Sequence, residues 1–164
     1  MKGLVRGLLP LWAILWFALG PLSLPSPAAA LSCTVSAGNH AFGSYSPFSP
    51  STVDSASTVQ VSCSATIIAV LVSYDIQLST GQSGTYSPRR MASGSNNLLY
   101  NLYTNSARTT VWGDGTAGTS IVSDSYLVVI GTTARNYSVY GRVPALQNAP
   151  PGSFADTITV TLNY

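Results

Sequence analysis

The sequence predicts an all-β fold, an antiparallel β-sandwich formed by one domain. Its apolar runs are short, rich in β-branched and aromatic residues, and separated by Gly, Ser, Pro and Asn. Several runs alternate apolar and polar residues with the period of two that a half-buried strand requires. Beyond the first 30 residues no segment keeps a helical period, so helices around a parallel sheet are not expected.

Six strands are expected before the last one. They lie at residues 33–35, 58–63, 66–79, 98–103, 125–130 and 137–143. In the second of them, Val59, Val61 and Cys63 share one face. In the third, apolar side chains at every second position of 72–78 alternate with polar ones, and the turn residues at 81–84 end the run.

The last nine residues, 156–164, alternate polar and apolar side chains without a break. Ile158, Val160, Leu162 and Tyr164 therefore share one face of a seventh strand. A strand with one apolar face needs a partner. The alternation leaves open whether the same chain or another protein provides it.

Residues 1–30 have the layout of a secretory signal peptide. Two basic residues precede an apolar run at 8–19, and three alanines ending at Ala30 offer the small-residue cleavage site. A signal anchor that stays in the membrane is the alternative, but the run is short for a bilayer span and contains Pro10. We expect cleavage after Ala30, export through the inner membrane, and one mature domain at 31–164.

The mature chain is expected to carry almost no net charge. Loss of Lys2 and Arg6 with the leader leaves five Arg and five Asp, with no Lys and no Glu. A basic patch that could bind nucleic acid or an anionic membrane cannot be assembled from this set. Abundant Ser, Thr, Gly and Tyr are instead typical of an exported all-β protein.

Cys33 and Cys63 are the only cysteines. In an oxidising compartment an even pair predicts one disulfide. A metal site is the alternative, but the pair lacks a C-x-x-C spacing and His40 is the only histidine. We therefore expect a structural disulfide, no metal and no other cofactor.

The segment 105–120 differs from the rest of the chain, because three glycines around Trp112 interrupt any regular strand. It is expected to form a long loop or a loose hairpin. In one hypothesis Trp112 and Asp114 form a surface-binding site. In the other, which turn chemistry favours, Trp112 is buried as a plug of the sandwich and Asp114 closes a tight turn.

Catalytic residues are not apparent. The mature chain has no Glu and no obvious pair among its Asp residues, so a two-carboxylate mechanism lacks candidates. A serine nucleophile would need His40, and no G-x-S-x-G motif is present. We expect no enzymatic activity.

A series of short motifs extends along the mature chain. They are CTV at 33–35, AFGSYSP at 41–47, VQVSC at 59–63, YDIQLS at 74–79 with Gly81 and Gly84, the pair Arg90 and Met91, LYNLY at 99–103, WGDGT at 112–116, YGRVP at 140–144 and GSFADT at 152–157. In this order the motifs resemble the spore coat protein U (SCPU) domain family, the subunits of Csu-type archaic chaperone–usher pili. The resemblance covers almost all of the mature chain.

The resemblance implies an immunoglobulin-like sandwich that lacks one strand, with a disulfide from Cys33 to Cys63. The vacancy would form an apolar groove beside the C-terminal strand. Its lining would include Ile158, Val160, Leu162 and Tyr164. A periplasmic pilus chaperone would lend a strand to this groove, and at the outer-membrane usher the N-terminal extension of a neighbouring pilus subunit would replace it. The implied function is that of a pilus or surface-fibre subunit supporting adhesion and biofilm formation, in the periplasm in transit and then at the cell surface.

The sequence departs from the family's rod subunits ahead of its first cysteine. Cleavage after Ala30 leaves only Leu31 and Ser32 before Cys33, and two residues cannot form a donor strand. An earlier cut would add the segment 21–30, whose three prolines cannot donate to a ladder. We therefore expect a subunit that accepts a strand but gives none, at a pilus tip or chain end.

Two hypotheses from other classes stay open. One is a self-sufficient secreted β-sandwich that binds a glycan or a surface through exposed aromatic residues. The other is an extracellular coat or matrix protein that self-associates through edge strands. The first would fold and stay monomeric without a chaperone, and the second would need no usher.

Overall fold

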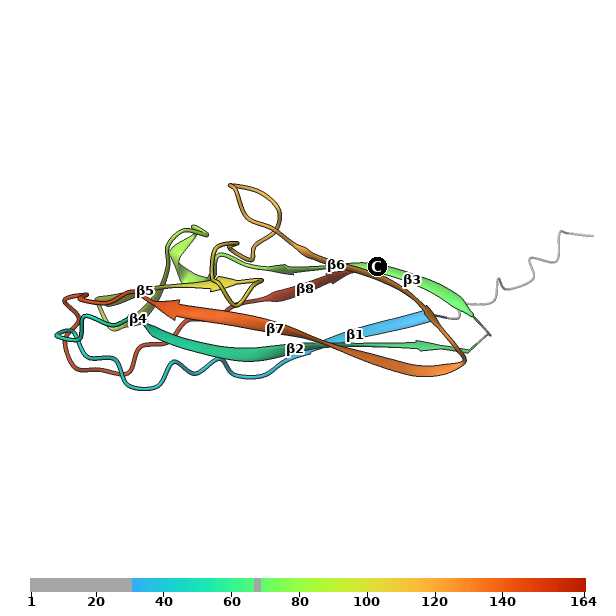
Figure 1. The fold of residues 1–164 in the computed structure, drawn as a ribbon, viewed down its shortest axis with the longest axis horizontal. Coiled ribbons are helices and arrows are strands. Elements are labelled where there is room, and N and C mark those ends of the chain that lie inside the picture. Colours follow the sequence, from blue (N-terminus) through green and yellow to red (C-terminus); the bar gives the residue numbers. More distant parts are fainter. Residues whose placement is uncertain (1–30, 67–68) are drawn as a thin grey trace, which may run out of the picture.

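The computed structural model describes residues 31–66 and 69–164, so the predicted leader and its cleavage site lie outside the described residues. Two β-sheets pack face to face as an elongated sandwich (Figure 1). The elements are β1 (Leu31–Ala37), β2 (Val53–Ala65), β3 (Val70–Leu78), the short 3-10 helix η1 (Gly81–Ser83), β4 (Arg89–Ser93), β5 (Asn96–Tyr103), β6 (Val122–Val128), β7 (Gly131–Val143) and β8 (Val160–Asn163).

One sheet has five strands in the order β1-β2-β7-β5-β4, and the other has three in the order β6-β3-β8. Every pairing between these strands is antiparallel. The all-β sandwich expected from the sequence is therefore confirmed. The described residues include no helix that is long and apolar enough to cross a membrane.

The strands differ from expectation in several places: β2 begins at Val53 rather than at residue 58, and β6 spans Val122–Val128 rather than 125–130. β4 was not expected, because Met91 is its only large apolar residue and no alternation marks it. β7 begins at Gly131 rather than at residue 137, because its first half is polar yet still pairs with β2 along its whole length. β8 is shorter than the alternating run at 156–164, of which only its four residues form a regular strand.

The core lies between the two sheets and is built from alternate positions of the strands. Val59, Val61 and Cys63 are buried in β2, and every second residue of 72–78 is buried in β3. These are the faces that the period of two predicts. Burying a side chain of this size stabilises a fold by roughly 1.5–3 kcal/mol, so the alternate positions hold the sheets together.

Cys33 and Cys63 form the expected disulfide. They are direct cross-strand partners in the β1–β2 pair, and their Cα atoms lie 4.1 Å apart. Both side chains are buried in the core. The bridge therefore fixes β1, the edge strand of the five-stranded sheet, to β2.

Candidate functional site

β1 and β8 are edge strands of opposite sheets. In the part of the chain that the structure describes, β1 pairs only with β2, and β8 pairs only with β3. A groove of about 470 Å³ opens between the chain that leaves β1 and the chain that enters β8. Its N-terminal wall consists of residues 37–40 and Phe42, and its C-terminal wall consists of residues 154–158 and Val160.

The floor of the groove is mainly apolar. Six core side chains from both sheets form most of it: Val59, Leu78, Met91, Tyr100, Leu102 and Val139. Each of them is less than a tenth exposed. A free strand edge beside an open apolar floor is a template for pairing with another chain. The groove is therefore suited to take up an extended segment.

Asp156 fixes the middle of the C-terminal wall. Its carboxylate accepts hydrogen bonds from the backbone N–H of Gln82 at 2.9 Å and from the hydroxyl of Tyr100 at 2.7 Å. Burial, and then the hydrogen bond to Asp156, raise the pKa of Tyr100, so its hydroxyl remains a donor. Gly81 packs on the carboxylate with φ +67°, and a side chain there would collide with Asp156.

Hydrogen bonds to both sheets hold the rest of this wall. The N–H of Ala92 in β4 donates to the carbonyl of Ala155 at 2.8 Å, and the N–H of Ala155 donates back at 3.0 Å. The N–H of Ser79 donates to the carbonyl of Thr159 at 3.0 Å, and the N–H of Thr159 donates to Ser79 Oγ at 2.9 Å. The C-terminal wall thus bridges β4 and the end of β3.

Replacing Asp156 with alanine is expected to lower the free energy of unfolding by about 1–3 kcal/mol, because the buried Tyr100 hydroxyl loses its acceptor. Urea denaturation followed by circular dichroism measures the loss. The matched control is Asp75→Ala, which removes a carboxylate that accepts an exposed hydrogen bond from Ser123 and should change stability by less than about 0.5 kcal/mol. Equal losses in the two variants would contradict the anchoring role of Asp156.

The N-terminal wall is attached to β2 and β7 through His40 and Phe42. The ring nitrogens of His40 lie 2.7 Å from Ser57 Oγ and 2.6 Å from Ser55 Oγ. The rings of His40 and Phe42 occupy the space above Gly141, where a Cβ atom would collide with both. The absence of a side chain at residue 141 lets this wall lie directly on β7.

Only some of the residues predicted to line the groove do line it. Ile158 and Val160 line it. Leu162 is partly buried against the core but is not among the lining residues. Tyr164 is 61% exposed and also lies outside the lining. The groove therefore involves the start of the alternating C-terminal run more than its end.

The residues that anchor the walls were not expected from the sequence. In the sequence, His40 is a candidate only as a metal ligand or a base, and Asp156 is only the first residue of the terminal run. Gly81 and Asp156 both belong to the family-like motifs, which is the available signal. Their contact joins residues far apart in the chain, so a single sequence does not reveal it.

Trp112 lies in the core, which contradicts the hypothesis of a surface-binding tryptophan. Its side chain is 0% exposed, and its indole N–H donates to the carbonyl of Ile76 at 3.0 Å. Asp114 accepts hydrogen bonds from the hydroxyl of Thr116 at 2.6 Å and from its N–H at 2.9 Å. These hydrogen bonds lower the pKa of Asp114. The carboxylate therefore closes a turn within its own loop.

The fold resembles a solved structure of a pilus assembly complex. That structure is the CsuC–CsuE chaperone–tip adhesion subunit pre-assembly complex from archaic chaperone–usher Csu pili of Acinetobacter baumannii. The matched chain is 24% identical with a TM-score of 0.54, and the match covers 82% of the present chain and 40% of the other. The present chain thus spans less than half of that chain's length.

Comparison with curated protein sequences gives no match. A family model does match: that of the Spore Coat Protein U domain, over residues 22–161. The first nine matched residues, 22–30, precede the expected cleavage site and lie outside the described residues. Because the match extends over most of the sequence, the chain belongs to the Spore Coat Protein U domain family.

Proposed function

We propose that this protein is a structural subunit of a chaperone–usher pilus or surface fibre, assembled by donor-strand complementation. The observation that carries the proposal is the groove between the edge strands β1 and β8, with an apolar floor and two anchored walls. Membership of the Spore Coat Protein U domain family and the likeness to a chaperone–subunit complex support the same function. The role is structural and requires no catalytic residue.

The proposed mechanism uses the free edge of β8. A donor strand pairs its main chain with this edge and inserts alternate side chains toward the floor, where Ile158 and Val160 contact them. A periplasmic pilus chaperone provides the first donor. At the outer-membrane usher a neighbouring pilus subunit provides the second, so the protein passes through the periplasm before it reaches the cell surface.

We further propose a position at the tip or end of a fibre, with a role in adhesion and biofilm formation. Leu31 and Ser32 already pair with β2, opposite Ala65 and Ser64, so they are engaged within the subunit's own sheet. Cleavage after Ala30 would leave no further residues to donate. Sequencing the mature N-terminus tests this proposal, and ten or more alternating residues ahead of β1 would overturn it.

Expression in the periplasm with and without a cognate chaperone tests the main proposal. The chaperone is expected to be required for soluble protein, because the open groove exposes apolar surface. Soluble, protease-resistant monomer obtained equally well without the chaperone would instead favour a self-sufficient sandwich. Ordered self-assembly without chaperone or usher would favour a coat or matrix protein.

Replacing Val160 with aspartate is expected to weaken binding of the chaperone strand by at least about tenfold, since a charge would replace an apolar contact in the groove. The matched control is Thr161→Asp, one residue further along β8, where the side chain is exposed. Copurification of the subunit with a tagged chaperone, followed by titration of the purified partners, measures the affinity. An equal loss in both variants would argue against insertion of side chains at Val160.

A further inference from the structure

His40 is the only histidine of the chain, and it joins the N-terminal wall of the groove to β2. Both ring nitrogens are engaged, Nδ1 with Ser57 Oγ at 2.7 Å and Nε2 with Ser55 Oγ at 2.6 Å. The ring also packs against Phe42 of the same wall, with centroids 4.9 Å apart. One of the side chains that hold this wall can therefore change its charge near neutral pH.

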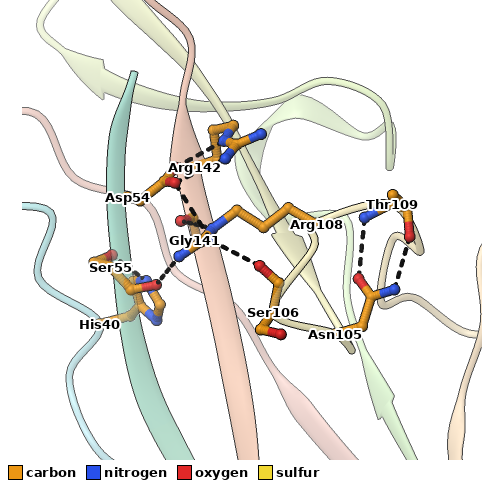
Figure 2. Close-up of polar contacts among 9 residues, drawn as sticks. All are labelled: His40, Asp54, Ser55, Asn105, Ser106, Arg108, Thr109, Gly141 and Arg142. Carbon is orange, nitrogen blue, oxygen red and sulfur yellow. Dashed lines mark hydrogen bonds and ion pairs between the residues drawn. The ribbon is translucent and has the colours of Figure 1, made fainter. Parts of the chain in front are cut away.

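The charge that acts on this ring is the guanidinium of Arg108, which reaches β2 and β7 from the loop between β5 and β6 (Figure 2). Arg108 Nε–H donates to the carbonyl of Gly141 at 3.0 Å, and a second nitrogen forms an ion pair with Asp54 at 3.3 Å. Asp54 is also paired with Arg142 at 2.7 Å. Its single negative charge is therefore shared between two cations.

The carboxylate of the opposite wall is directed to other donors than His40. The carboxylate of Asp156 is occupied by Tyr100 and Gln82, and burial keeps the Tyr100 hydroxyl protonated by raising its pKa. Within residues 31–66 and 69–164, the hydrogen bonds of the His40 ring go to serine hydroxyls and to no carboxylate. A proton on His40 would thus add a second positive charge beside Arg108 in a half-buried site.

We propose that His40 is a pH-sensitive latch on the N-terminal wall of the groove. The neutral ring holds residues 38–42 against Ser55 and Ser57. The protonated ring could still donate to both serine hydroxyls, so it is the burial of its charge and the repulsion from Arg108 that release this segment and widen the groove. The consequence for assembly, weaker strand capture in acid, rests on the proposed function.

The direction of the pH effect follows from the environment of the ring. Burial first, and the charge of Arg108 second, lower the pKa of His40 from its ordinary value of 6.5. The unfolded chain therefore binds the proton more readily than the folded chain does. The contribution of the latch is fully present above the ordinary pKa, and it is lost as the pH falls through the lowered value.

Hydrogen exchange measured by mass spectrometry on tag-free protein tests the latch at about pH 7.5 and about pH 5. Rates are corrected for intrinsic pH dependence with an unstructured peptide of the same sequence. Protection of the Gly38 amide, which donates to the carbonyl of Thr58 at 3.3 Å, is expected to fall in acid, because the folded chain binds the proton on His40 less readily than the unfolded chain does. Protection of β6, which pairs with β3 away from His40, should stay unchanged.

His40→Gln is the matched variant, because glutamine has a donor and an acceptor but does not titrate. Its Gly38 amide should show no acid-dependent loss of protection. The same loss in this variant, or no loss in the wild type, overturns the latch. An NMR titration of the single histidine is a second test that needs no variant, and a pKa at or above 6.5 also overturns it. Because no donor strand is added, failure here is distinct from failure of the proposed function, which the chaperone experiment detects.

Discussion

Replacing Trp112 with alanine is expected to lower the free energy of unfolding by about 3–5 kcal/mol. The side chain is fully buried, and its backbone links the irregular segment 105–120 to the rest of the fold. The backbone N–H of Trp112 donates to the carbonyl of Leu102 at 2.9 Å, and the backbone carbonyl of Trp112 accepts from the guanidinium of Arg89 at 2.7 Å. The substitution would leave a large cavity at a point where several elements meet.

The loss is measured by urea denaturation followed by far-ultraviolet circular dichroism, because the expected mature chain has no other tryptophan to report by fluorescence. Trp112→Phe is the matched control. It keeps most of the ring volume and removes the hydrogen bond to Ile76, so its loss should be smaller than that of the alanine variant, about 1–2 kcal/mol. A loss below about 1 kcal/mol for Trp112→Ala would show that the buried indole is not essential to the core.

Removing both cysteines is expected to destabilise the fold by about 3.5 kcal/mol, the value of the chain-entropy model for a loop of about 30 residues. Cys33 and Cys63 tie β1 to β2, the strand with which β1 is paired. The Cys33→Ala/Cys63→Ala variant should therefore also show faster hydrogen exchange in β1 than in the interior strand β7. Unreduced and reduced wild-type protein, compared under the same conditions, provide the control.

Two results would contradict a stabilising role of the disulfide. If the double variant unfolds at the same urea concentration as the oxidised wild type, the bridge contributes nothing measurable to stability. If stability falls but β1 keeps its protection, the strand pairing alone holds the edge of the sheet. Either result would show that the disulfide is not needed to hold β1 against β2.

Hydrophobic alternation predicted the faces that build the core, because a strand between a core and solvent must alternate. The buried faces of β2 and β3 follow it residue by residue. β4 gave no such signal, since it lies between turns and presents one large apolar residue, Met91. Its place in the sheet is set by pairing with β5, a tertiary effect that local sequence does not encode.

The groove was predictable in its location but not in its construction. The alternating run and the family-like motifs pointed to Ile158, Val160, Leu162 and Tyr164, of which only the first two line the groove. The contacts that hold the walls join His40 to β2 and Asp156 to Tyr100 and Gln82 across long stretches of sequence. Such polar contacts depend on the folded arrangement of the sheets, so they appear only in three dimensions.

Photo-crosslinking from inside the groove shows directly whether a strand of another protein lies in it. Ile158 is replaced with p-benzoylphenylalanine, and Ser125, exposed in β6, is replaced in the control. We expect crosslinks from position 158 to an extended strand of the chaperone in the periplasm and to a neighbouring subunit in fibres, identified by mass spectrometry of the joined peptides. Position 125 should give neither. Crosslinks that are absent from position 158, or equally frequent from both positions, would contradict a strand-accepting groove.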